Sequence, residues 1–205
     1  MPDLGIIAAL YPAAAPQRKC HIIMSETAER VRLPHLELLG DATPFAGKIH
    51  ALIERSPLFE NFNLAEIRLM SHFMQVFSSE PGLELVREGD AGDFMMLIIE
   101  GSIEVFKQDR WNAPRLIALL NAGQTVGEMS MIDGEPRFAS CIAAERCTVA
   151  VLTRESLARI ILEQPVLGAK ILMELVLMLS KRLRLTSAKL VNYMDKYEGE
   201  NSAGD

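Results

Sequence analysis

The string from Val126 to Ser140 constrains the fold more than any other part of the chain. Its skeleton reads G-E-x5-G-x-P-R-x-A-S. Gly127 permits a sharp turn and close approach of a ligand. The next five residues can form one helical turn, whose first N–H groups lack intrahelical partners and favour an anion. Arg137 follows with a guanidinium fork that matches phosphate oxygens. Glu128 is itself anionic and suits a sugar hydroxyl instead. The string therefore predicts a pocket for a small sugar phosphate.

This string resembles the phosphate-binding cassette of cyclic nucleotide-binding domains, which occur in protein kinase A regulatory subunits and bacterial catabolite activators. The match is carried by the order and spacing of Gly127, Glu128, Gly134, Pro136, Arg137 and Ala139. The resemblance implies that Glu128 holds the ribose 2′-hydroxyl and that Arg137 holds the cyclic phosphate. The expected ligand is cAMP, with cGMP or cyclic di-GMP as alternatives. The cassette residues expected at the site are Val126, Gly127, Glu128, Met129, Ser130, Arg137, Phe138, Ala139 and Ser140.

Short apolar segments separated by turn residues recur through the middle of the chain, at spacings of about ten residues. They cover residues 76–77, 85–86, 94–99, 102–107, 115–120, 141–143 and 148–152. This pattern predicts a small sandwich or barrel. The resemblance implies an α+β fold with an eight-stranded antiparallel β-roll, also called a double-stranded β-helix or jelly roll. Residues 88–105 resemble the middle section of that roll.

The pattern before the strands divides the chain. Residues 1–47 show no clear periodicity and contain several prolines, so we expect a poorly structured extension. Apolar residues from Ile49 onward predict a short helix ending at Ser56-Pro57, and a second helix is expected over 64–73. With the roll they form the predicted binding domain, residues 48–164. Residues 56–62 also resemble the helical lead-in of the family.

A long helix is predicted to follow the roll. Thr153 is a plausible N-cap for a first helix, which Gln164-Pro165 interrupts. No proline follows, so residues 165–197 are expected to form one dimerisation helix, followed by a flexible tail at 198–205. Two heptad positions carry mostly apolar residues, namely Leu172, Leu179, Thr186 and Tyr193, then Val176, Leu183, Leu190 and Tyr197. This coiled-coil seam predicts a homodimer through residues 172–197.

Residues 182–190 resemble the dimer helix of the catabolite activators. By that resemblance Thr186 and Ser187 would contact the base, although a threonine at a seam position can also set the register of two helices. The residues after Val191 are too few for a helix-turn-helix domain. We therefore expect signalling through an unknown effector protein and no direct DNA binding.

Composition excludes several other classes. The net charge of −6 disfavours broad nucleic-acid contact. No apolar run is long enough to span a membrane, and the N-terminal stretch lacks the basic leader of a signal peptide. Cys20, Cys141 and Cys147 lack metal-ligand spacing and suit a reducing cytoplasm. All four histidines precede the predicted strands, so neither a metal site nor an enzyme active site is expected.

Phe138 departs from the family pattern, because kinase-type sites usually carry Ala or Thr there and bacterial activators carry Ser. By resemblance this side chain lies beside the phosphate and base, and a Thr there would favour guanine. A Phe ring could fill the ligand's space or could pack over the ligand. The alternative hypothesis is therefore a nucleotide-free dimeric scaffold in which Phe138 plugs a degenerate site.

Overall fold

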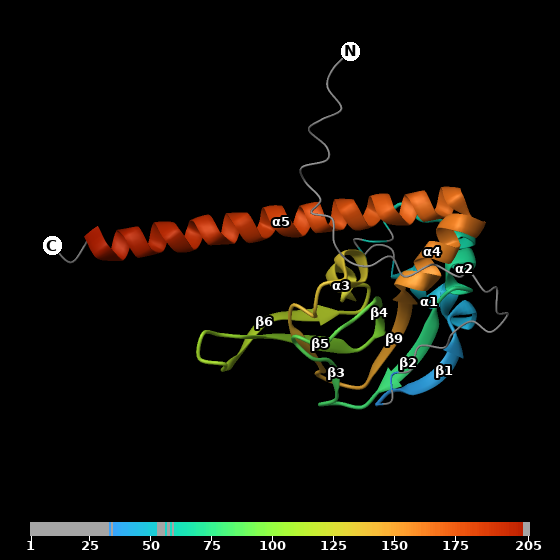
Figure 1. Cartoon of the computed structure of the whole chain (residues 1–205), viewed down its shortest axis with the longest axis horizontal. Helices are drawn as coiled ribbons and strands as arrows, with labels where there is room; N and C mark the ends of the chain where they lie inside the picture. The colour runs from blue at the N-terminus through green and yellow to red at the C-terminus, as the bar shows by residue number, and fades with distance from the viewer. Residues whose placement is uncertain (1–32, 34, 53–55, 57, 59, 203–205) are drawn as a thin grey trace, which may run out of the picture. The chain divides into compact units, whose positions relative to one another are not determined.

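The computed structural model describes residues 33–202, except 34, 53–55, 57 and 59. Its strands form two antiparallel sheets (Figure 1). The first sheet contains, in spatial order, β1 (Glu37–Asp41), β2 (Gln75–Ser79), β9 (Cys147–Thr153), β4 (Phe94–Glu100) and β7 (Thr125–Val126). The second contains β3 (Glu84–Val86), β8 (Ser140–Ala143), β5 (Ser102–Gln108) and β6 (Pro114–Asn121). The α+β roll is confirmed, with nine described strands in two sheets and no closed barrel.

The central strands β4 and β9 of the first sheet are buried on both faces. Along β4, Met96 and Ile98 join a core cluster between the two sheets, whereas Met95 and Leu97 join a cluster beneath the helices. A strand covered on both sides reads as a continuous apolar run instead of an alternating pattern. This explains why residues 94–99 stood out in the sequence.

The N-terminal boundary differs from the prediction. β1 lies inside the segment expected to be unstructured and pairs with β2. Its side chains are mostly exposed, so it lacks the alternation that reveals a half-buried strand. A 3₁₀ turn, η2 (Thr43–Phe45), leads into α1 (Ala46–Ala51). The helix therefore ends before Ser56-Pro57, which was predicted as its end. The rest of the predicted extension, residues 1–32, lies outside the described residues.

Local capping signals fix the other helices. α2 (Leu64–Ser71) begins at a capping box, in which the Asn63 side chain accepts from the Glu66 N–H and the Glu66 carboxylate accepts from the Asn63 N–H. α4 (Arg154–Glu163) begins at Thr153, whose hydroxyl accepts from the Ser156 N–H at 2.9 Å. The break at Gln164 is confirmed, and α5 (Pro165–Ser202) starts at the proline.

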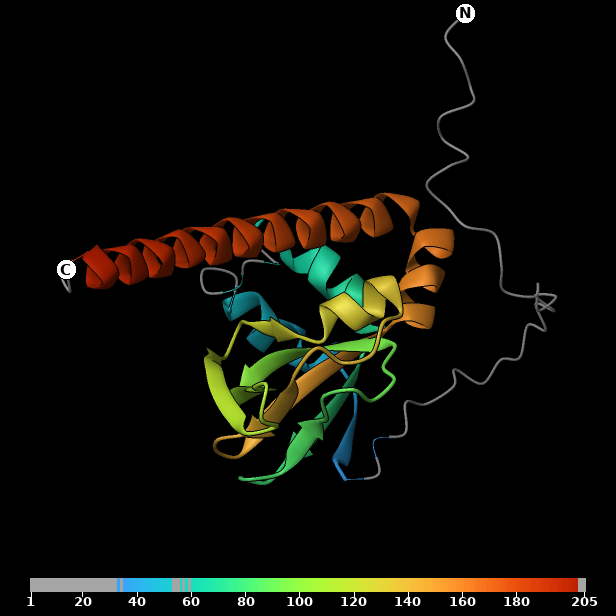
Figure 2. The same ribbon diagram turned by 60° about the vertical axis from the view of Figure 1, so that its left-hand side comes forward.

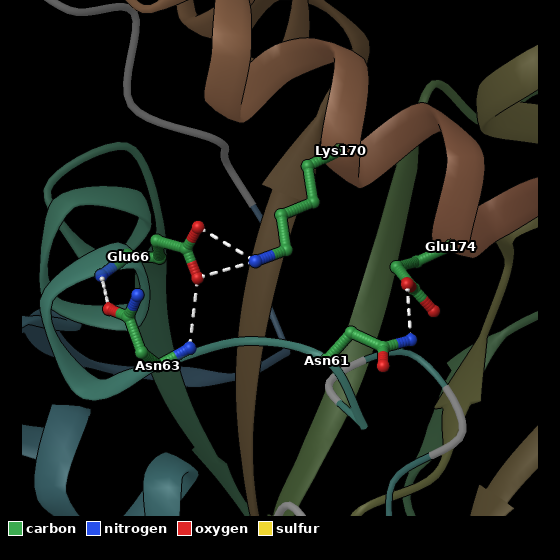
Figure 3. Close-up of polar contacts among 5 residues, drawn as sticks. All are labelled: Asn61, Asn63, Glu66, Lys170 and Glu174. Carbon is green, nitrogen blue, oxygen red and sulfur yellow. Dashed lines mark hydrogen bonds and ion pairs between the residues drawn. The ribbon is translucent and has the colours of Figure 1, made fainter.

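α5 packs against the rest of the domain along its first half. Its buried apolar side chains are Leu167, Ile171, Leu175 and Met178. Polar contacts accompany them (Figure 3). Lys170 Nζ lies 2.7 Å from both carboxylate oxygens of Glu66, and Asn61 Nδ2 donates to Glu174 Oε1 at 2.7 Å. The helix runs to Ser202, beyond the predicted end at residue 197. Within the described residues, no helix is both long and apolar enough to cross a bilayer.

Candidate functional site

Arg137 is the buried cation of the cassette. The residue is only 4% exposed. Its Nη1 donates to the carbonyls of Phe94 at 2.8 Å and Gly127 at 3.1 Å. The guanidinium carbon lies 4.2 Å from the centre of the Phe94 ring. Nη2 is buried and has no hydrogen-bond partner among the described residues. Nη2 of Arg137 is therefore free to donate to a ligand, and the contacts of Nη1 fix its orientation.

Two glycines make room for this guanidinium. A Cβ on Gly92 would collide with Arg137 Nε, and one on Gly127 would lie 2.5 Å from Nη1. Gly127 also has a φ of +85°, which side-chain-bearing residues rarely adopt. The cassette glycine is therefore needed both for its backbone angle and for the close approach of Arg137.

Glu128 is the buried anion of the cassette. It is the first residue of α3 (Glu128–Asp133), the short helix predicted after Gly127, and is 2% exposed. Oε1 forms an ion pair with Arg182 Nη1 of α5, while Oε2 is buried without a partner in the described part of the chain. Burial raises the pKa of Glu128, and the charges of Arg182 and Arg137 oppose that rise. Burial disfavours the charged form of Arg137 as well, and for a cation this lowers the pKa.

Arg182 connects the cassette to the long helix. Besides Glu128, its Nη2 donates to the Thr125 carbonyl at 2.9 Å. In the same place, the Thr125 hydroxyl lies 3.3 Å from the sulfur of Met178. α5 therefore contacts both β7 and the start of α3, and Figure 2 shows it passing over them.

Arg154, the first residue of α4, hydrogen-bonds to the backbone of the cassette helix α3. Its Nη2 donates to the Ser130 carbonyl at 2.8 Å and its Nε donates to the Met131 carbonyl at 2.7 Å. These carbonyls belong to α3, and a cation there complements the end of the helix. Gly134 ends α3 in the left-handed conformation, with a φ of +80°.

The remaining predicted cassette residues occupy different environments. Val126, Ser130 and Ala139 are buried, and Met129 is exposed. The Ser140 hydroxyl accepts from the Glu88 N–H at 2.9 Å, so it braces the loop before β4. Phe138 is 54% exposed, with its ring centre 4.4 Å from Lys107 Nζ. A ring that plugged the site would be buried, and Phe138 is not.

Thr186 and Ser187 are exposed on α5, in the turn after Arg182. Residues four apart share one face of a helix, so Thr186 lies on the face that carries Arg182 toward the cassette. Within the described structure, neither Thr186 nor Ser187 forms a side-chain hydrogen bond with the cassette. Their predicted contact with the base stays a prediction.

Sequence reasoning missed Arg182, Gly92 and Arg154. Arg182 is separated from Glu128 by 54 residues, so only the folded chain reveals the pair. One signal existed, because Arg182 lies about one turn before Thr186 within the stretch that resembles the family's dimer helix. Gly92 and Arg154 carry no local pattern that distinguishes them from other turn and helix residues. Among the described residues, no three His, Cys, Asp or Glu side chains gather as metal ligands do.

Comparisons with known proteins agree with this geometry. A model of the cyclic nucleotide-binding domain matches residues 76–164. The crystal structure of a cyclic nucleotide-binding domain from Methylobacillus flagellatus KT has 35% sequence identity and a TM-score of 0.71, covering 78% of this chain and 90% of that one. The crystal structure of the Thermus thermophilus catabolite activator protein has 29% identity and a TM-score of 0.62, covering 68% and 63% respectively.

A curated relative extends the comparison. The cyclic AMP receptor protein of Thermus thermophilus is 30% identical over 135 residues, which is 66% of this chain and 61% of that protein. The chain thus spans less than two thirds of the length of this relative. The family model matches the cassette and most of the roll, and the chain covers 90% of the solved Methylobacillus flagellatus domain at 35% identity. This chain therefore belongs to the cyclic nucleotide-binding domain family.

Proposed function

We propose that this chain is a cAMP sensor that acts as a homodimer and signals to a protein partner. One observation carries the proposal: Glu128 Oε2 and Arg137 Nη2 are both buried and both without partners among the described residues. An unpaired buried polar atom costs about 1–3 kcal/mol. A ligand that brings a phosphate oxygen to Nη2 and a sugar hydroxyl to Oε2 would remove both costs. A cyclic nucleotide carries these two groups on adjacent parts of one ring system.

The contact between Arg182 and Glu128 suggests how binding would be sensed. Arg182 holds Oε1 and leaves Oε2 for the ribose hydroxyl, so one carboxylate can bind the ligand and α5 together. Thr186 lies a turn further along the same face, which suits a contact with the base. The position of α5 would then report whether the cassette is occupied.

cAMP is favoured over other ligands by two observations. The Thermus thermophilus relative is named a cyclic AMP receptor protein. Phe138 occupies the position where, by resemblance, a Thr would favour guanine. The exposure of Phe138 also argues against the nucleotide-free scaffold, since its ring does not lie buried against Arg137.

The homodimer is supported by exposed seam residues. Val176, Leu183, Leu190 and Tyr193 are each about 60% exposed or more on the single chain. A second α5 packed along these positions would bury them as a coiled coil. A regulatory role in the cytoplasm, without catalysis, agrees with the names of the relatives and with Cys141 and Cys147 being free thiols.

Isothermal titration calorimetry tests the ligand assignment. Arg137→Ala should weaken cAMP binding by about 2–5 kcal/mol, because the phosphate would lose its buried partner. Arg146→Ala is the matched control, since this arginine forms an exposed pair with Glu80. Equal affinities for the wild type, Arg137→Ala and Arg146→Ala would contradict the proposal.

A further inference from the structure

Phe138 holds a large aromatic ring in water at the edge of the cassette. Its neighbours Arg137 and Ala139 are buried, whereas Phe138 is 54% exposed. An aromatic ring gains free energy when a flat apolar surface covers it. Consecutive Cα atoms are about 3.8 Å apart, so the ring is attached next to the guanidinium that is proposed to bind the phosphate. A ligand held by Arg137 therefore lies close to Phe138.

The ring lies on the side of β5 that faces the interior of the roll. Side chains alternate between the two faces of a strand, and Ile103 and Val105 of β5 are buried in the core between the sheets. Lys107 is the next residue on that face, and its Nζ lies 4.4 Å from the centre of the Phe138 ring. The ring therefore borders the same interior that holds the Arg137 guanidinium.

Hydrogen bonds fix Lys107 beside the ring. Its Nζ donates to Glu88 Oε1 at 2.6 Å and to the Phe138 carbonyl at 2.8 Å. Glu88 is fixed in turn, because its Oε2 accepts from the Gln108 N–H at 2.9 Å and its own N–H donates to the Ser140 hydroxyl at 2.9 Å. The cation covers one face of the ring, and the remaining exposure leaves the other face open to a flat partner.

The position of a nucleotide base follows from the proposed function, on which this inference rests. There the phosphate lies at Arg137 and the ribose hydroxyl at Glu128, and the base extends from the end of the ribose opposite the phosphate. α5 runs over α3 toward the side on which the β5–β6 hairpin extends, as Figures 1 and 2 show. Lys107 is near the hairpin end of β5, which ends at Gln108. A base on this side lies between α5 and the Phe138 ring.

We propose that Phe138 stacks on the base of the bound nucleotide and contributes to the choice of ligand. Every base has a π-face, so an aromatic side chain can stack on any of them. A purine covers more of the ring than a pyrimidine does, so Phe138 favours purine nucleotides. Phe138 touches the ligand in this account, whereas Lys107 is a positioning residue that acts through the ring.

Calorimetric titration of the full chain with cAMP and with cyclic UMP (cUMP) tests the stack. Phe138→Ala should weaken cAMP binding roughly five- to hundredfold, the usual effect of losing one base–aromatic stack. cUMP carries the same sugar and phosphate with a smaller base, so its loss should be several times smaller. Trp111→Ala is the matched control and should bind both ligands as the wild type does. Its ring is also exposed and covered by a cation, with Arg110 at 3.9 Å, but it lies at the hairpin tip.

A second pair of variants tests the role of Lys107. Lys107→Met should weaken cAMP binding several-fold and cUMP binding less, and Lys107→Arg should restore cAMP binding because Arg also donates and stacks on rings. In the Phe138→Ala background, Lys107→Met should cause no further loss, since the ring that it positions is gone. Lys48→Met is the control, because Lys48 likewise pairs with a glutamate, Glu100, and lies 5.9 Å from the Phe45 ring centre. Circular dichroism checks that each variant is folded.

The outcomes separate this inference from the proposed function. If the wild type binds cAMP and Phe138→Ala binds it equally well, the sensor stands and the stack is refuted. Equal losses for cAMP and cUMP would mean that the ring only supports Arg137, and tighter binding by Phe138→Ala would mean that it fills the ligand's space. Either result overturns the inference, and a wild type that binds no cyclic nucleotide overturns both proposals. NMR gives the direct readout: nuclear Overhauser effects should join adenine H2 or H8 to ring protons that Phe138→Leu removes.

Discussion

Arg182 of α5 forms an ion pair with the buried carboxylate of Glu128. The pair joins the first residue of the cassette helix to the long helix, across 54 residues of sequence. Because Glu128 Oε2 has no partner in the described part of the chain, the carboxylate can bind a ligand and α5 at once. In the proposed function, this pair is the physical connection between nucleotide binding and the position of α5.

Loss of this pair should destabilise the domain. Arg182→Ala leaves Glu128 buried without its cation, and we expect the free energy of unfolding to fall by about 1–3 kcal/mol. The lower part of the range is favoured because the Arg182 side chain is 39% exposed and partly screened by solvent. Urea denaturation measures the change. Arg184→Ala, an exposed neighbour on α5, is the control, and equal losses in both variants would refute a specific role for Arg182.

Glu128 should also give stability a distinctive pH dependence. Burial raises its pKa in the folded state above the ordinary value of 4.5, so the folded protein binds this proton more tightly than the unfolded chain does. The stability linked to Glu128 is therefore fully present below about pH 4.5 and is lost as pH rises through the raised pKa.

Glu128→Gln removes this dependence and provides the reference. Urea denaturation of both proteins between neutral pH and pH 4.5 should show the wild type gaining stability relative to Glu128→Gln as pH falls. The other carboxylates titrate in both proteins and cancel in the difference. A difference that stays constant, or moves the opposite way, would show that Glu128 is not a desolvated carboxylate.

Gly92→Ala should weaken cAMP binding without adding or removing a polar group. The new Cβ would collide with Arg137 Nε, so the guanidinium must leave its place against Phe94. We expect a loss of affinity of about tenfold or more in calorimetry, since a small displacement of an anchoring group is costly. Gly47→Ala is the control, because a Cβ there meets nothing within 4 Å. Identical binding by both variants would mean that Arg137 does not hold the phosphate.

The contact between Lys170 and Glu66 should contribute more to stability than the exposed pair further along α5. Glu66 also closes the capping box of α2, so one carboxylate joins α2 to α5. Lys170→Met should lower the free energy of unfolding by about 1 kcal/mol, the upper end for a partly exposed pair. Lys181→Met, which removes a pair more than 60% exposed on both sides, should change it by about 0.3 kcal/mol. Thermal denaturation compares them, and the reverse order would contradict this account.

The parts of the fold that could be predicted from sequence are those set by local chemistry. The turn at Gly127, the helix after it, the cap at Thr153 and the break at Gln164 all depend on neighbouring residues. β1 and β7 were missed for different reasons. β1 is largely exposed, and β7 is only two residues long, too short for any period to appear.

The site was predictable only in part, for a related reason. The cassette is one continuous string, so Glu128 and Arg137 could be chosen from sequence. Arg182 and Gly92 act through distant contacts that the folded chain creates. The ambiguity over Phe138 was also a question of side-chain direction, because it depends on how the bend at residues 138–139 orients the ring. Arg137 points inward and Phe138 outward, which a sequence alone does not state.

The most direct test of the central claim is the melting temperature of the full chain with cAMP, cGMP or cyclic di-GMP. A ligand at 100 times its dissociation constant stabilises a protein by about 2.7 kcal/mol. For a chain of this size that corresponds to a rise of roughly 5–10 °C. We predict this rise with cAMP, and a smaller rise with the other two at the same concentration. Unchanged melting with all three at millimolar concentration would contradict the assignment of a cyclic nucleotide sensor.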